Sequence, residues 1–127
     1  MWPFSRKEPL GRKAFREEFD TVTAKLRRAD EASQVAVGHT INMANSFFIQ
    51  RFTAIESFRK LPKAEKIAYI ESLTSMEEKL TTKDPHAAVG FGLFKMWVGA
   101  LSEGDDELVS KFSKELAFFS KKGDLRV

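Results

Sequence analysis

Apolar residues recur every three or four positions along almost the whole chain, which is the spacing of one face of an α-helix. No segment shows a convincing alternation of apolar and polar residues, the pattern of a half-buried strand. Short polar turns separate the helical segments, and short connections favour antiparallel neighbours. The sequence therefore predicts an all-α fold, a compact bundle with mainly antiparallel neighbours. We expect about five helices, over residues 12–30, 33–58, 62–80, 85–102 and 106–121.

The segment before the first predicted helix, residues 1–11, contains Pro3, Pro9 and Gly11. This composition is typical of an irregular N-terminal arm. The 127 residues suffice for one domain of ordinary size. We therefore predict a single helical-bundle domain over residues 12–123, followed by a C-terminal tail over residues 124–127.

Capping signals define several of the predicted boundaries. Asp84 followed by Pro85 is a strong start signal, with an N-cap side chain and a proline at the first helical position. Ser33 is expected to cap the second helix. Gly123 is expected to stop the last one, because glycine favours the residue after a helix end.

The second and fourth predicted helices are apolar around much of their circumference, which places both in the core. Lys95 is the one charged residue between Pro85 and Ser102. Three glycines of the fourth helix each cost roughly 1 kcal/mol of helix propensity relative to alanine. Close approach of neighbouring helices is the simplest compensation for the glycines at Gly90, Gly92 and Gly99.

The composition excludes several classes of protein and directs attention to phenylalanine. Without cysteine, the chain forms no disulfide scaffold, zinc finger, thiol enzyme or iron–sulfur protein. The 12 phenylalanines outnumber the leucines, and most fall on predicted inner stripes. The phenylalanine excess therefore indicates core filling. A role outside the core is open for four of them, Phe4, Phe47, Phe58 and Phe118.

Charge and targeting signals indicate a cytoplasmic protein of mild basicity. The net charge is +3, and the basic residues are mostly interleaved with acidic ones. No stretch of about 20 apolar residues suggests a membrane span, and no secretory signal is recognisable. At the N-terminus, Trp2 and Phe4 precede two cations and give weak affinity for an anionic membrane surface. We favour an arm that folds back on the bundle or is mobile.

The chain contains two histidines, His39 and His86. They raise the hypothesis of metal binding, or of a general base with an orienting carboxylate. Neither histidine belongs to a His-x-x-x-His or Glu-x-x-His pattern, which such metal sites commonly use. We therefore predict no catalytic residue, no metal and no cofactor. A small helical enzyme or cofactor binder using His39 or His86 stays as an alternative.

Two surface patterns are candidates for binding. His39, Asn42 and Ser46 form an uncharged polar stripe on the second helix, with Asn45 beside them and Gln50 as a candidate extension. This stripe is either a partner-facing or self-associating surface, or else a modest buried hydrogen-bond network or a shallowly exposed face.

The second pattern is the basic run of Arg59, Lys60, Lys63 and Lys66. If the helix continued through Pro62, three of these cations would share a face and could bind phosphate. A solvated turn and helix start is the commoner explanation for four such charges.

The leading hypothesis is a non-enzymatic protein–protein interaction module, a small cytoplasmic adaptor, regulator or assembly factor that can form a homodimer. A nucleic-acid-binding helical protein that uses residues 59–66 is a second alternative to it. The residues expected to contribute to interaction are His39, Asn42, Ser46, Phe47, Phe58, Arg59, Lys63 and Lys66.

Overall fold

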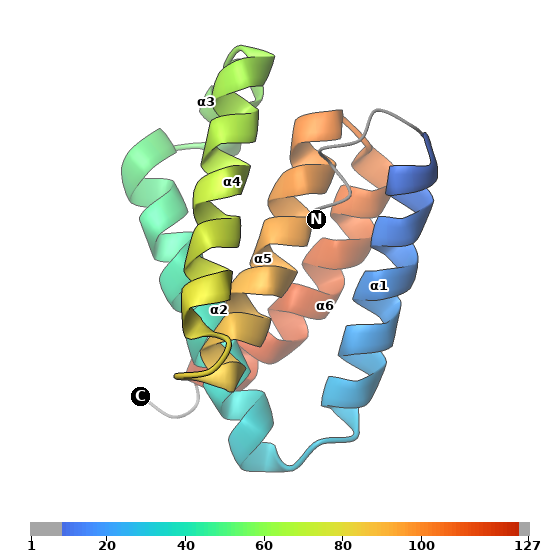
Figure 1. Cartoon of the computed structure of the whole chain (residues 1–127), viewed down its shortest axis with the longest axis vertical. Helices are drawn as coiled ribbons and strands as arrows, with labels where there is room; N and C mark the ends of the chain where they lie inside the picture. Colours follow the sequence, from blue (N-terminus) through green and yellow to red (C-terminus); the bar gives the residue numbers. More distant parts are fainter. Residues whose placement is uncertain (1–8, 125–127) are drawn as a thin grey trace.

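The computed structural model describes the backbone of residues 9–124 and the side chains of residues 16–124 (Figure 1). Within that range the chain is an all-α bundle without strands, as predicted, but with one helix more than expected. The helices are α1 (Pro9–Arg27), α2 (Glu31–Phe52), α3 (Ile55–Arg59), α4 (Lys63–Leu80), α5 (Pro85–Glu103) and α6 (Asp106–Asp124).

The additional helix results from a break after Phe52, so the prediction of one continuous helix over residues 33–58 was wrong. Thr53 adopts a φ of 69°, in the left-handed region that a β-branched residue rarely occupies. Ala54 is extended and precedes the single turn of α3. The break lets Phe58 turn back into the core, where its ring centroid lies 5.1 Å from that of Phe52.

Two aspartates hold the starts of the central helices. A carboxylate oxygen of Asp84 accepts a hydrogen bond from the Ala87 N–H at 3.2 Å, which confirms the predicted cap of α5. At the start of α2, Asp30 accepts a hydrogen bond from the Ser33 N–H at 3.0 Å. Asp30 is therefore the cap, and Ser33, the predicted cap, is the residue that it holds.

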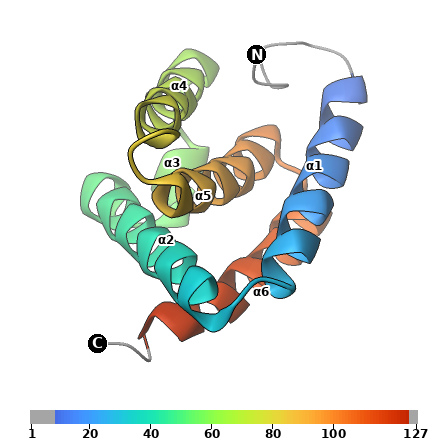
Figure 2. The same cartoon turned by 60° about the horizontal axis from the view of Figure 1, so that its bottom comes forward.

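Helix α5 is the centre of the bundle, packed between α2, α4 and α6 (Figure 2). Every residue from Gly90 to Leu101 is buried, which confirms the predicted core position of this helix. Phe48 of α2 packs against it within a group of aromatic rings. The ring centroids of this group lie 5.0–6.0 Å from that of Phe48 and belong to Phe52, Phe58, Tyr69, Phe94 and Trp97.

An ion pair between a buried lysine and a partly exposed glutamate joins α5 to α4. Lys95 is only 4% exposed, and its ammonium donates a hydrogen bond to the carboxylate of Glu77. Gly92 provides the room for that carboxylate, because a Cβ atom there would lie 2.6 Å from Glu77 Oε2. The expected packing role of the α5 glycines is confirmed at this position. It also holds for Gly90, where a Cβ atom would lie 2.7 Å from Thr40 Cβ of α2.

Helices α2 and α6 approach each other at backbone distance through two glycines. A Cβ atom on Gly38 would lie 1.8 Å from the carbonyl oxygen of Phe119, and one on Gly123 would lie 2.6 Å from the carbonyl carbon of Gly38. Gly123 lies inside α6, so its predicted role as a stop signal was wrong. From this contact the two helices diverge, and α5 lies in the angle between them (Figures 1 and 2).

Candidate functional site

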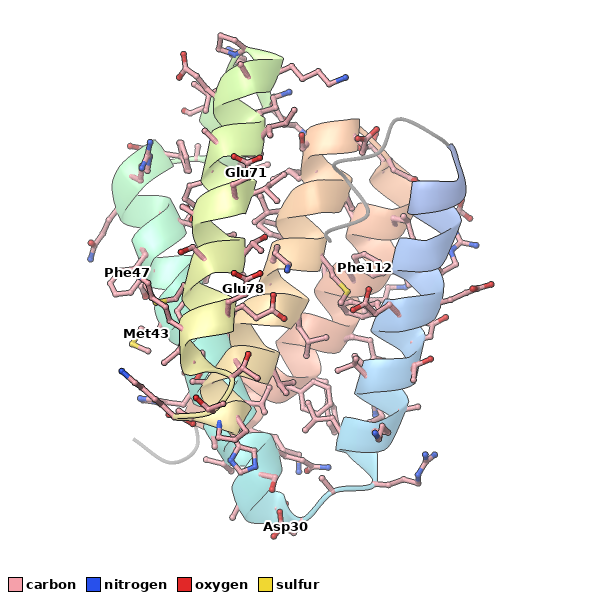
Figure 3. The ribbon with its side chains drawn as sticks, viewed as in Figure 1. Asp30, Met43, Phe47, Glu71, Glu78 and Phe112 are labelled. Atoms are coloured by element: carbon pink, nitrogen blue, oxygen red, sulfur yellow. The ribbon has the colours of Figure 1, made fainter. Side chains whose placement is uncertain are left out.

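The outer face of α2 is exposed and carries no charged side chain between Glu31 and Arg51. Met43 and Phe47 are 41% and 52% exposed on this face, and both project away from the bundle (Figure 3). They belong to a stripe, named here the neutral ridge, whose members are spaced along one side of the helix. The neutral ridge consists of the exposed side chains of His39, Met43, Ser46, Phe47 and Gln50.

Helix α4 also carries an exposed apolar side chain, Met76. Tyr69 of α4 packs against Phe52 of α2 with ring centroids 4.9 Å apart, and the Arg51 guanidinium lies 5.6 Å from the Tyr69 ring. Burial raises the pKa of Tyr69, and the charge of Arg51 partly opposes that effect. Met76 lies two helical turns after Tyr69 on the same side of α4 and is 43% exposed. Met76 is therefore an exposed methionine on the side of α4 that carries Tyr69.

On its opposite flank, α2 is joined to α6 by hydrogen bonds. Asn42 Nδ2 donates to the Ser120 carbonyl at 3.0 Å and to Asp124 Oδ1 at 2.9 Å. The Ser120 hydroxyl donates to Asn42 Oδ1. Within the predicted polar stripe, Asn42 is therefore part of a hydrogen-bond network between helices, whereas His39 and Ser46 are exposed.

A cavity of about 190 Å³ opens between α2, α5 and α6, beside this network. Phe94 and Trp97 of α5 contribute buried aromatic rings to it. The Trp97 indole N–H donates a hydrogen bond to Ser113 Oγ at 2.9 Å, which fixes the orientation of the ring. All lining residues are uncharged, and the remaining ones are Ile41, Asn42, Asn45, Leu116, Ala117 and Ser120.

The two histidines occupy exposed positions on different helices, His39 on the neutral ridge and His86 in the first turn of α5. Within the described residues, no group of three or more His, Cys, Asp or Glu side chains is placed to hold a metal ion. Hydrogen bonding from Ser33 lowers the pKa of Asp30, and the charge of His86 acts in the same direction. The histidines are therefore separate surface residues in this arrangement.

The basic run is divided between two helices and a turn. Arg59, the last residue of α3, pairs with Asp106 of α6 and with Glu56. Lys63 begins α4 after Pro62, and Lys66 is half-buried in its first turns. The helix does not continue through Pro62, so the condition for a shared face of Arg59, Lys63 and Lys66 is not met.

Three of the phenylalanines considered for roles outside the core differ in environment. Phe58 is fully buried, so its assignment to an interaction surface was wrong. Phe118 is half-buried beneath the Arg27 guanidinium, 3.9 Å from its ring centroid. Phe47 is the one of the three that is exposed. Trp2 and Phe4 lie outside the described residues.

The cavity residues of α5 and α6 were not recognised from the sequence as site residues. A signal for them exists on α6, where Ser113, Ala117 and Ser120 follow one another at helical spacing on a helix that is otherwise rich in charged and large apolar residues. Small side chains along one flank leave space against the neighbouring helix. The location of that space depends on the angle between α2 and α6, which the sequence pattern does not specify.

Comparison with known proteins gives no relative. No family model matches the chain, and neither a curated protein nor a solved structure is similar to it. Among the described residues, no helix has the length and apolar character needed to cross a membrane.

Proposed function

We propose that this protein is a non-enzymatic protein–protein interaction module of the cytoplasm, and that the neutral ridge of α2 is its contact surface. The observation that supports the proposal is an exposed helix face without formal charge in a chain of which 31% of residues are charged. Interface cores are depleted in charged residues and enriched in aromatic residues and methionine. Phe47 and Met43 give this surface that character.

The partner that fits this surface best is a second copy of the chain. An uncharged face meets its own copy without like-charge repulsion. Its two ends carry opposite charges, because Asp30 and Glu31 precede it and Arg51 follows it, all exposed. Antiparallel pairing about a two-fold axis brings the acidic start of one α2 near the basic end of the other. The helix dipoles are then also favourably opposed.

The size of the surface indicates a dimer of modest affinity. From His39 to Gln50 the ridge extends about 17 Å along the helix axis. A contact made mainly by one helix face belongs to the smaller protein interfaces. We therefore expect a dissociation constant on the order of micromolar, at which monomer and dimer exchange.

Sedimentation equilibrium of the full chain over a range of concentrations tests this proposal. The wild-type protein is expected to change from monomer to dimer, and Phe47→Ser is expected to remain monomeric at the same concentrations. The matched control is Ile67→Ser, which removes an exposed apolar side chain of α4, and it should dimerise like the wild type. A wild-type protein that stays monomeric throughout contradicts self-association, and equal dimerisation of both variants contradicts the role of the ridge.

A charge exchange tests the antiparallel arrangement itself. Arg51→Glu places acidic residues at both ends of the ridge and should weaken the dimer about tenfold, with a strong dependence on salt. Adding Glu31→Arg to that variant places a cation beside Asp30, which leaves the start of the ridge without net charge, removes the repulsion between the two ends and should restore part of the affinity. A double variant no tighter than Arg51→Glu alone contradicts antiparallel pairing of α2.

A further inference from the structure

The cavity between α2, α5 and α6 lies on the other flank of α2 from Met43 and Phe47, and the neutral ridge does not account for it. We propose that this cavity is a binding site for a small neutral molecule with a single planar ring that carries a carboxamide or hydroxyl group. The inference rests on the size of the cavity, on the absence of charged residues in its lining and on the polar groups at its rim. It does not depend on dimer formation.

The cavity volume determines the size of the ligand. About 190 Å³ is slightly larger than an engineered cavity of about 150 Å³ that takes up benzene. It is smaller than the roughly 300–1,000 Å³ of pockets for nucleotides and drug-sized molecules. One ring with a short substituent therefore fits the space, and a cofactor of several rings does not.

The lining determines the charge and shape of the ligand. Because no lining residue is ionisable, a charged ligand would lose hydration without gaining an ionic partner. The buried rings of Phe94 and Trp97, with centroids 5.4 Å apart, offer aromatic contacts to a planar molecule. The hydrogen bond from Trp97 to Ser113 holds this surface in place before a ligand enters.

The rim determines the polar group of the ligand. Asn42 and Ser120 are engaged with each other and hold the wall together. Asn45 is exposed at the rim, and its side chain makes no hydrogen bond to another group of the described chain. Its amide presents one acceptor and an N–H donor pair, which complement a carboxamide or a hydroxyl group. Ser113 Oγ accepts from Trp97 and keeps its own proton to donate.

Titration of the full chain with benzamide, followed by amide and indole NMR signals, tests the proposal. The Trp97 indole N–H and the Asn45 side-chain amide are both reporters inside the site. Benzamide is expected to shift both signals with a dissociation constant on the order of 1 mM. Benzoate has the same ring and a negative charge, and it should bind at least tenfold more weakly.

Two variants and one control make the result decisive. Ala117→Phe fills the cavity from the exposed side of α6 and should abolish the shifts, and Asn45→Ala should weaken binding about fivefold. Ala68→Phe adds the same side chain to an exposed position of α4 and should leave binding unchanged. The proposal is overturned by unshifted signals at saturating benzamide, by equal binding of benzoate, or by equal binding to Ala117→Phe. Repeating the titration on Phe47→Ser separates this result from dimerisation.

Discussion

Phe47 and Phe48 are neighbours in one helix, have the same side chain and occupy opposite environments. Phe48 is fully buried and surrounded by five aromatic rings, whereas Phe47 is 52% exposed on the neutral ridge (Figure 3). One step of about 100° around the helix separates them. The pair shows that hydrophobicity alone does not define a role, because the position on the helix circumference decides which surface a side chain meets.

The largest expected effect is the loss of Phe48. Phe48→Ala removes the ring that contacts α3, α4 and α5 residues together, and it should destabilise the protein by about 3–5 kcal/mol. Urea denaturation followed by circular dichroism measures this change. A loss of unfolding free energy below about 1 kcal/mol would mean that the aromatic group repacks around the missing ring. The packing of the inner face of α2 would then not require this ring.

A methyl group between α2 and α6 should have the next largest effect. Gly38→Ala places a Cβ atom against the backbone carbonyl of Phe119, which cannot turn away as a side chain does. We expect a loss of about 2–3 kcal/mol, despite the better helix propensity of alanine. Gly92→Ala is the comparison, since its Cβ atom meets the flexible carboxylate of Glu77 and should cost less. Equal losses of stability in Gly38→Ala and Gly92→Ala would contradict the view that the α6 backbone limits the contact at Gly38.

The cap of α2 should contribute a smaller, pH-dependent effect. Because hydrogen bonding from Ser33 lowers the pKa of Asp30 in the folded state, the charged carboxylate stabilises the fold above the pKa of the unfolded chain. This contribution disappears as the pH falls through the lower folded pKa. Asp30→Ala should therefore reduce the urea midpoint at about pH 6 more than at about pH 3.

Asp30→Asn is the matched control for this prediction. Asparagine keeps the capping hydrogen bond and loses the charge. Its urea midpoint should therefore exceed that of Asp30→Ala, and it should vary less with pH than that of the wild type. If the urea midpoints of Asp30→Ala and the wild type differ by the same amount at both pH values, the charge of Asp30 does not stabilise the fold.

The smallest expected effect on folding belongs to Phe47. Phe47→Ala should change the free energy of unfolding by less than about 0.5 kcal/mol when the protein is monomeric, because the side chain is 52% exposed and projects away from the bundle. Phe47→Ala is measured in the same urea assay, at a concentration low enough to keep the protein monomeric. Its unfolding free energy can then be compared directly with that of Phe48→Ala. A loss comparable with that of Phe48→Ala would place Phe47 in the core and remove the basis of the neutral ridge.

Much of this fold follows from the sequence pattern. The spacing of apolar residues predicts the all-α bundle, the central position of α5 and the core role of most phenylalanines. Asp84 and Pro85 also place the start of α5 correctly, because capping depends on residues close together in the chain. Local signals of this kind can be recognised without the tertiary structure.

The remaining features depend on contacts between distant residues. Neither glycine nor proline lies next to Thr53, so the sequence does not predict the helix break there. The break is stabilised by the burial of Phe58 against another helix. Asn42 and Ser46 are equally polar in the sequence, yet only Asn42 meets α6. The cavity likewise depends on the angle between two helices. Periodicity identifies a helix face, and tertiary packing decides what covers it.

The contact between α2 and α6 also affects the order in which the chain folds. Asn42 and Ser120 are 78 positions apart, whereas Glu77 and Lys95, which join α4 to α5, are 18 apart. Closing the longer loop costs about 1 kcal/mol more in chain entropy. During synthesis from the N-terminus, α2 is complete at Phe52 and α6 only at Asp124, so the flank of α2 around Gly38 lacks its neighbour until 72 more residues have been added. Until then, that flank of α2 is open to a chaperone that shields apolar segments.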